Sequence, residues 1–82
     1  MSENQEAIMS EITTQHFYTA LSKKVSGYNA KLLLNSAMIQ VGFNQINADP
    51  LKLDDAKNIC LELIKKGGPA FYVGKEIYQQ IQ

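Results

Sequence analysis

The chain has 82 residues, enough for one small domain, and 45% of them are hydrophobic, which is too many for a disordered protein. A domain of this size buries only about 60 to 65 per cent of the surface that its unfolded chain exposes, so a partner or a second copy would add usefully to its stability. Eight basic residues balance eight acidic ones, which leaves no net charge to attract phosphate backbones or anionic lipid.

Features of membrane and secreted proteins are absent from the sequence. No apolar run approaches the roughly 20 residues of a membrane span, and the first residues do not combine a basic segment with an apolar one. The single cysteine, Cys60, has no second cysteine with which to form a disulfide or a thiolate metal site. We therefore expect a cytoplasmic protein that needs no cofactor and does not bind a membrane.

Hydrophobic periodicity predicts an all-α fold, a compact domain of four helices in which strands are not needed. Residues 1–10 are polar and are expected to form a flexible N-terminal segment, followed by a single helical domain over residues 11–82. The helices are predicted over residues 11–24, 28–41, 53–65 and 69–81. We find no internal sequence repeat.

The first helix is predicted to bury Phe17 and Leu21 and to end at Ser26 and Gly27. Glycine accepts the left-handed conformation that closes a helix C-terminus. His16, the only histidine, lies in this helix without a cysteine or carboxylate at ligand spacing. We therefore interpret it as an ordinary surface or partly buried histidine and not as a metal ligand.

The helix over residues 28–41 carries apolar residues on two faces. Its predicted core face consists of Ala30, Leu33, Leu34, Ala37, Met38 and Val41. Tyr28, Leu32 and Ile39 form a second stripe on the opposite face. A helix of this kind is either sandwiched inside the domain or half exposed at a binding surface, and the sequence leaves that choice open.

Gly42 and Phe43 resemble a glycine cap with its accompanying apolar contact, which would end this helix before a loop rich in asparagine and aspartate. The next helix is predicted to bury Ala56, Ile59, Cys60, Leu63 and Ile64. Asp54 and Asp55 suit its first turn, and their spacing does not match that of a calcium-binding loop.

Two lysines and two glycines precede the last helix. Lys65, Lys66, Gly67 and Gly68 would form an anion site if the lysines and the free N–H groups of the helix start converged. However, the spacing of a phosphate-binding loop is absent, and Pro69 removes one donor. Glycine before proline is also typical of a helix boundary. We interpret the stretch as a turn, with the anion site as the alternative.

The last helix is predicted to bury Ala70, Val73, Gly74, Ile77, Tyr78 and Ile81. A glycine within a helix costs about 0.5 to 1 kcal/mol relative to alanine, so Gly74 indicates the close approach of another backbone. Tyr72 falls on the polar side of this helix, where a core role does not explain it. Phe71, at the margin of the inner face, is a further aromatic candidate.

Catalytic chemistry is not indicated. Cys60 falls on the inner face of a helix, where a free cysteine acts as a small apolar filler, and only His16 could serve as its base. No convergent pair of acid and base emerges. We therefore expect that the protein is not an enzyme.

An interaction function remains. We predict a small regulatory or adaptor-like protein-interaction module that associates with itself or with another protein. Its candidate interaction residues are Tyr28, Leu32, Ile39, Phe71, Tyr72 and Tyr78. One alternative is a helix-turn-helix regulator built from residues 53–65 and 69–81, although neutral charge and the absence of arginine make nucleic acid an unlikely partner. Another alternative is a subunit that contributes to a shared enzyme or carrier complex.

Overall fold

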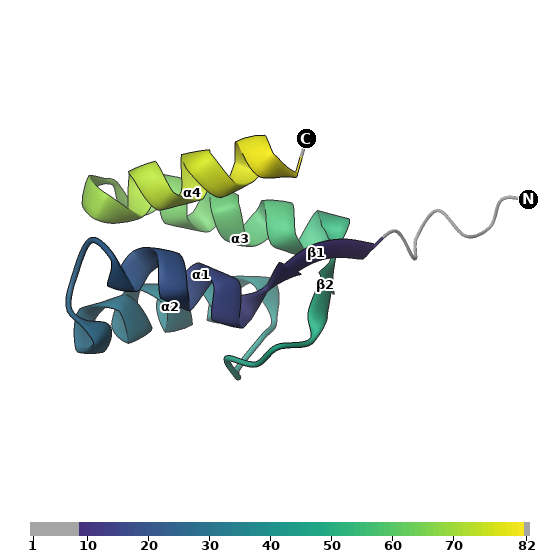
Figure 1. The fold of residues 1–82 in the computed structure, drawn as a ribbon, viewed down its shortest axis with the longest axis horizontal. Helices are drawn as coiled ribbons and strands as arrows, with labels where there is room; N and C mark the ends of the chain where they lie inside the picture. Colours follow the sequence, from purple (N-terminus) through teal and green to yellow (C-terminus); the bar gives the residue numbers. More distant parts are fainter. Residues whose placement is uncertain (1–8, 82) are drawn as a thin grey trace, which may run out of the picture.

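The computed structural model describes residues 9–81. Over this range the chain is mostly helical, with four helices and a small two-stranded sheet, so the helical part of the predicted fold is confirmed (Figure 1). The elements are β1 (Met9–Thr13), α1 (Thr14–Ser22), α2 (Gly27–Val41), β2 (Pro50–Lys52), α3 (Leu53–Lys66) and α4 (Gly68–Gln80). All four helices lie within three residues of their predicted limits.

The prediction that the fold needs no strands is wrong. β1 and β2 pair antiparallel, with Met9 opposite Lys52 and Thr13 opposite Pro50, and the register is irregular between these two pairs. Each strand buries one apolar side chain, and these two side chains belong to the core. They are Ile12 in β1 and Leu51 in β2. Pairing through the backbone therefore joins segments that are far apart in the sequence.

β1 contains residues 11–13 of the predicted first helix, together with Met9 and Ser10 of the predicted flexible segment. The Ser10 hydroxyl donates to the Leu51 carbonyl at 3.0 Å, a bond to β2 that favours the extended conformation here. The rest of the predicted flexible segment, residues 1–8, lies outside the described residues.

α1 begins at Thr14 because Thr13 is its N-cap, with an extended backbone and a hydroxyl that accepts the His16 N–H at 3.0 Å. Thr14 itself is buried, and its hydroxyl accepts the Asn47 N–H at 2.8 Å. The Gln15 N–H donates to the Asn47 carbonyl at 3.0 Å. The loop before β2 is thus attached to the first turn of α1.

The order strand, helix, helix occurs twice, as β1-α1-α2 and as β2-α3-α4. In each half the two helices pack on one another, and the paired strands lie where the halves meet (Figure 1). Buried residues recur at the same spacing, namely Ala30, Leu34 and Ala37 in α2 and Ala70, Gly74 and Ile77 in α4. No repeat is visible in the sequence, because the burial spacing recurs while most of the residue types differ.

The two ends of α2 differ in how well they were predicted. Gly27 is not the C-cap of α1, which ends at Ser22; it is the first residue of α2, and Ser26 is the N-cap that accepts the Asn29 N–H at 3.1 Å. The predicted cap at Gly42 is confirmed. Gly42 has a φ of 99°, and the following Phe43 N–H donates to the Met38 carbonyl at 2.9 Å.

α3 and α4 are joined by Gly67 alone, and they pack closely along one another. A Cβ atom at Gly74 would lie 2.7 Å from the Cys60 carbonyl oxygen and 3.0 Å from the Leu63 Cβ. The predicted close approach at Gly74 is therefore confirmed. The absence of a side chain at this position lets the α4 backbone approach α3.

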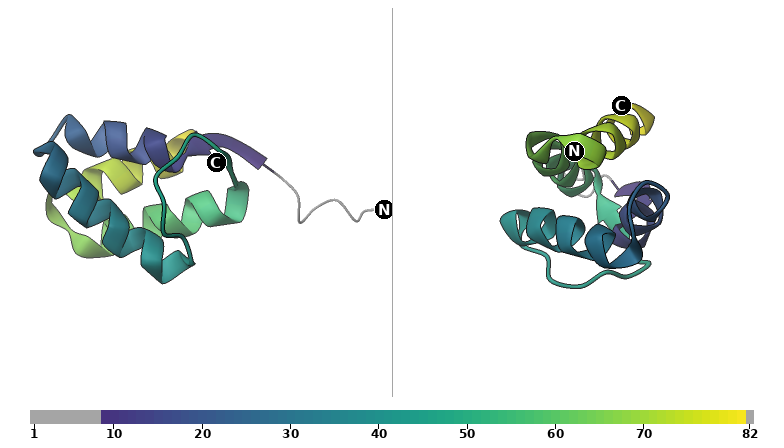
Figure 2. Two further views of the ribbon diagram at one scale, coloured as in Figure 1. Left: turned by 90° about the horizontal axis from the view of Figure 1, so that it is seen from below. Right: turned by 90° about the vertical axis from the view of Figure 1, so that its left-hand side faces the viewer.

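The core is a single cluster to which every described element contributes. Its largest fully buried side chains include Phe17, Leu21, Leu34, Met38, Ile59, Leu63 and Ile77. Figure 2 shows α2 on one side of the domain and α4 on the other, with α1 beside α2 and α3 beside α4. Each helix consequently has one face toward the core and one face away from it.

Replacing Gly74 by alanine should destabilise the domain. Alanine's higher helix propensity would stabilise the folded state by about 0.5 to 1 kcal/mol. Overpacking against the Cys60 carbonyl typically costs about 1 to 3 kcal/mol, so we expect a net decrease in the free energy of unfolding. Urea unfolding measures the difference. Glu76→Ala, at an exposed position of the same helix, is the control and should leave stability nearly unchanged. A Gly74→Ala variant as stable as the parent would contradict the close packing.

Replacing Thr14 by valine keeps the shape of the buried side chain but removes the acceptor for the Asn47 N–H. We expect a loss of about 1 to 2 kcal/mol in the free energy of unfolding, and faster hydrogen exchange at the Asn47 amide. Thr14→Ser retains the hydroxyl and should keep the amide protected. Equal exchange rates in the two variants would show that this bond does not hold the loop.

Candidate functional site

The structure decides which of the two apolar faces of α2 is core. Ala30, Leu34, Ala37 and Met38 are completely buried. On the opposite side Tyr28 is 74% exposed, Leu32 51% and Ile39 65%. We call these three residues the α2 outer face. The helix is therefore not sandwiched inside the domain, and its second stripe lies on the surface.

Position 35 continues this stripe. Residues 28, 32, 35 and 39 follow one another in steps of four, three and four, so their side chains fall within about 60° around the helix axis and extend over about 16 Å. Asn35 is only half-buried. The only charged side chain of α2 is Lys31, which lies to one side of the stripe. The surface is thus a narrow, uncharged, mainly apolar stripe.

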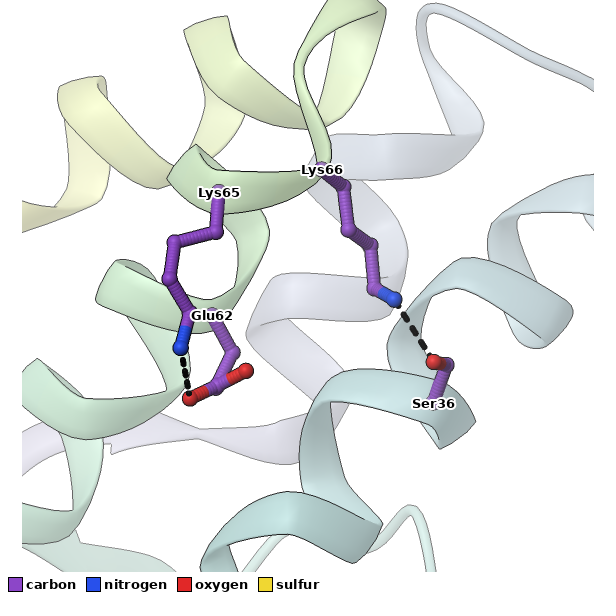
Figure 3. Close-up of polar contacts among 4 residues, drawn as sticks. All are labelled: Ser36, Glu62, Lys65 and Lys66. Carbon is purple, nitrogen blue, oxygen red and sulfur yellow. Dashed lines mark hydrogen bonds and ion pairs between the residues drawn. The ribbon is translucent and has the colours of Figure 1, made fainter.

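The other side of the stripe borders α3. Lys66, at the end of α3, donates from Nζ to the Ser36 Oγ at 2.6 Å (Figure 3). Further along, a shallow groove of about 520 Å³ separates the C-terminal end of α2 from α3. Its apolar lining is Val41, Leu61 and Ile64, and Leu61 is 45% exposed.

Leu61 is an exposed apolar residue that the sequence analysis did not select. The signal was present, since Leu61 is absent from the predicted inner face of its helix. A second, smaller groove of about 250 Å³ lies between Leu61 and Ile64 of α3 and Tyr78 of α4. Two of these three residues also line the groove beside α2, so the outer side of α3 borders both grooves.

The aromatic candidates of α4 have different environments. Tyr72 is 62% exposed, whereas Phe71 is half-buried and Tyr78 packs against the core. The Phe71 and Tyr72 rings meet edge to face with centroids 5.2 Å apart, and the Lys75 Nζ lies 5.9 Å from the Phe71 centroid. These residues lie on α4, across the domain from α2 (Figure 2). The six candidate interaction residues therefore do not form one patch.

The two lysines of the candidate anion site have different partners. The Lys65 Nζ lies 3.0 Å from the Glu62 Oε2, while Lys66 contacts Ser36 of α2 (Figure 3). Gly67 and Gly68 have φ values of 75° and 58°, as expected for a tight turn between helices. The anion site stays a prediction, and the turn itself is what the backbone shows.

The helix-turn-helix alternative also stays a prediction. It would use α3 and α4, and the exposed side chains of α4 are Pro69, Tyr72, Lys75, Glu76, Gln79 and Gln80. The charges of Lys75 and Glu76 cancel, so the exposed side of α4 has no net positive charge with which to attract phosphate groups. Basic groups that bind a nucleic acid would have to lie elsewhere on the surface.

The side chains that could bind a metal or act in catalysis do not cluster in the described part of the chain. Within residues 9–81 no three His, Cys, Asp or Glu side chains come together as a metal site. His16 is exposed, whereas Cys60 is fully buried. Burial raises the pKa of the Cys60 thiol from its ordinary 9.0 to about 12. None of the described helices has the length and apolar character needed to cross a membrane.

Comparison of the chain with models of known protein families, with curated proteins and with solved structures finds no match.

The Cys60 thiol should resist alkylation in the folded protein. Burial keeps it protonated and inaccessible, so iodoacetamide at about pH 8 should modify it only after urea unfolding, which mass spectrometry would show. Between pH 9 and about pH 12 the folded state retains a proton that the unfolded chain loses, so stability should fall as the pH rises through this window. Cys60→Ala controls for other titrating groups.

Proposed function

We propose that the chain is a non-catalytic protein-interaction domain, of regulatory or adaptor type, that binds its partner through the α2 outer face. One observation carries this proposal: a helix whose inner side fills the core keeps Tyr28, Leu32 and Ile39 half or more exposed on its other side. We also propose a cytoplasmic location, where a single free thiol stays reduced.

The size of the exposed surface supports this function. The three side chains together expose roughly 350 Å² of mostly apolar area. For comparison, one whole aromatic side chain buries about 150–250 Å². The largest apolar patch on a typical monomer measures about 300 to 600 Å² and is often functional. Burying this area against a partner would contribute about 9 kcal/mol before the costs of association, at about 25 cal/mol per Å². The loss of translational and rotational freedom on association costs about 4 to 15 kcal/mol, so this area by itself supports weak binding.

The charge pattern restricts the partner. α2 has one charged side chain, so a partner would dock mainly through apolar contacts and a small number of polar ones. An electrostatically guided partner would need a charged surface that α2 does not offer. Binding at this face should therefore depend little on ionic strength.

Charges introduced on the α2 outer face should abolish binding without unfolding the domain. We expect Leu32→Glu with Ile39→Lys to change the free energy of unfolding by less than about 1 kcal/mol, because both side chains already face solvent. The lysine is placed near the helix C-terminus, where a cation is favoured. Leu34→Glu, at a completely buried position of the same helix, should unfold the domain, and circular dichroism distinguishes the two outcomes.

Binding itself is tested in cells of the native host with a photo-crosslinking residue at position 35, between Leu32 and Ile39. We expect a defined crosslinked polypeptide that disappears in the Leu32→Glu, Ile39→Lys background. The same photo-crosslinking residue at Glu76 of α4 is the control and should give no such product. Crosslinking that is equal at the two positions, or unfolding of the charged variant, would contradict the proposal.

A further inference from the structure

We infer that one end of the domain binds single-stranded nucleic acid, with lysines on the phosphates and exposed tyrosines stacked on the bases. At this end α1 connects to α2 and α3 connects to α4, opposite the two strands (Figures 1 and 2). We call it the lysine end, and its exposed lysines are Lys23, Lys24, Lys31, Lys65 and Lys66. It is a second surface beside the α2 outer face, and the two surfaces share only Tyr28.

The charges of the described residues are separated along the domain. The lysine end carries five lysines and one acidic residue, Glu62. The opposite end consists of the strands, the loop before β2 and the first turns of α3, and it carries four acidic residues and two lysines. These are Glu11, Asp49, Asp54, Asp55, Lys52 and Lys57. The zero net charge of the whole chain therefore conceals a positive end, which attracts polyanions.

Helix dipoles account for only part of this separation. A lysine near a helix C-terminus is favoured, which suits Lys23 at the end of α1 and Lys65 at the end of α3. Lys31, however, lies near the start of α2, and neither α2 nor α4 has an acidic residue in its first turn. α3 begins at the opposite end of the domain and has Asp54 and Asp55 there. The helix starts at the lysine end thus lack the carboxylates that would compensate them.

The lysines with partners in the structure can still bind an anion. The Lys66 Nζ donates to the Ser36 Oγ at 2.6 Å, and this neutral partner leaves the charge of the ammonium group uncompensated (Figure 3). The Lys65 Nζ lies 3.0 Å from the Glu62 Oε2, but the Lys65 side chain is 69% exposed. Ion pairs of such exposed groups are weak, so a phosphate can compete for the lysine.

Exposed aromatic rings accompany the lysines. Tyr28 lies in the first turn of α2 and Tyr72 in the second turn of α4, and both are more than half exposed. Side chains on a helix lean toward its N-terminus, so both tyrosines lean toward the lysine end. The Phe71 ring meets Tyr72 edge to face at 5.2 Å, and the Lys75 Nζ lies 5.9 Å from the Phe71 centroid. Each half of the fold thus supplies a pair of lysines and an exposed tyrosine.

This combination favours single strands over other polyanions. Proteins that bind single strands combine ammonium groups on the phosphates with aromatic rings on the bases. In a duplex the base faces are already stacked on one another. An acidic protein segment would pair with the lysines but would leave the rings without bases. Lysine also contacts phosphate as a point charge, whereas arginine forms bidentate contacts, so binding should show little sequence preference.

Fluorescence anisotropy with a labelled oligothymidine of about 12 nucleotides tests the binding. Four lysines that each neutralise one phosphate of a single strand give a slope of about −2.8 for log K against log salt concentration. Affinity should accordingly fall about 50-fold between about 50 and about 200 mM salt. Absence of binding at about 50 mM salt with protein up to about 500 µM, or binding that salt does not weaken, overturns the inference.

Substitution of the lysine pairs locates the phosphate contacts. Lys23→Gln with Lys24→Gln, and separately Lys65→Gln with Lys66→Gln, should each reduce the salt slope by about half, because each removes two of the four contacts. Circular dichroism checks that both variants fold, as exposed positions lead us to expect. An unchanged slope in either folded variant overturns the inference.

Lys52→Gln with Lys57→Gln is the matched control, because it removes the same charge from the opposite end of the domain. Its salt slope and its affinity for oligothymidine should equal those of the parent. A loss as large as that of the other two pairs would show a general effect of net charge and would overturn the assignment to the lysine end.

The tyrosines should contribute affinity without a salt effect. Tyr28→Ala and Tyr72→Ala should each weaken binding about fivefold or more, with the salt slope unchanged, because stacking involves no counterion. Leu61→Ala, which removes an exposed apolar side chain from α3, is the control and should bind like the parent. Full affinity in both tyrosine variants would exclude stacking and overturn the inference.

Competition identifies the class of polyanion. Unlabelled oligothymidine should displace the labelled strand at least about fivefold better than a duplex of the same length or polyglutamate does. Equal or better displacement by polyglutamate would assign the lysine end to an acidic protein. Equal or better displacement by the duplex would assign it to double-stranded nucleic acid. Either outcome overturns the inference.

This binding is distinguishable from the proposed function of the α2 outer face. Ile39 lies about 12 Å along α2 from Lys31, beyond the Debye length of about 10 Å, so Ile39→Glu should bind oligothymidine like the parent. Loss of binding in that variant would place the nucleic acid on the α2 outer face and overturn the inference. If the parent binds no oligothymidine while host crosslinking still depends on Leu32 and Ile39, the inference fails and the proposed function stands.

Discussion

Pairing between β1 and β2 is the constraint on which the arrangement of the helices depends. It is short, but it joins the start of the first half of the chain to the start of the second, and Thr14 adds bonds from α1 to the loop that precedes β2. Ile12 and Leu51 then enter the same core. With both halves held at this end, α1 and α3 lie on either side of α2 and cover only one of its faces.

The composition of α2 fits this position. Alanines at 30 and 37 let neighbouring helices approach closely, while Leu34 and Met38 fill the space between them. Tyr28, Leu32 and Ile39 cannot be buried within the domain, because no further helix or strand covers the other side of α2 in the described part of the chain. An interaction surface is thus a consequence of covering a helix that is apolar on two faces with neighbours on only one of them.

The site shows where sequence reasoning succeeds and where it stops. Tyr28, Leu32 and Ile39 were identifiable as a second stripe, because helical periodicity determines which residues share a face. Phe71 and Tyr78 were selected as aromatic residues at the margin and on the inner face of their helix, and in the structure Phe71 is half-buried while Tyr78 packs against the core. Leu61 was missed although it lies off its predicted inner face. Lys65 and Lys66 are adjacent in sequence, but successive residues on a helix point about 100° apart, so they reach different partners.

By itself the sequence determined the four helices, their inner faces, the cap at Gly42 and the need for a glycine at position 74, because these depend on periodicity and local backbone chemistry. Tertiary structure alone decided two things. Residues 9–13 became a strand because a partner strand was available, and the second stripe of α2 stayed exposed because neighbours cover only the other face. Both depend on contacts between residues distant in sequence, which local patterns do not encode.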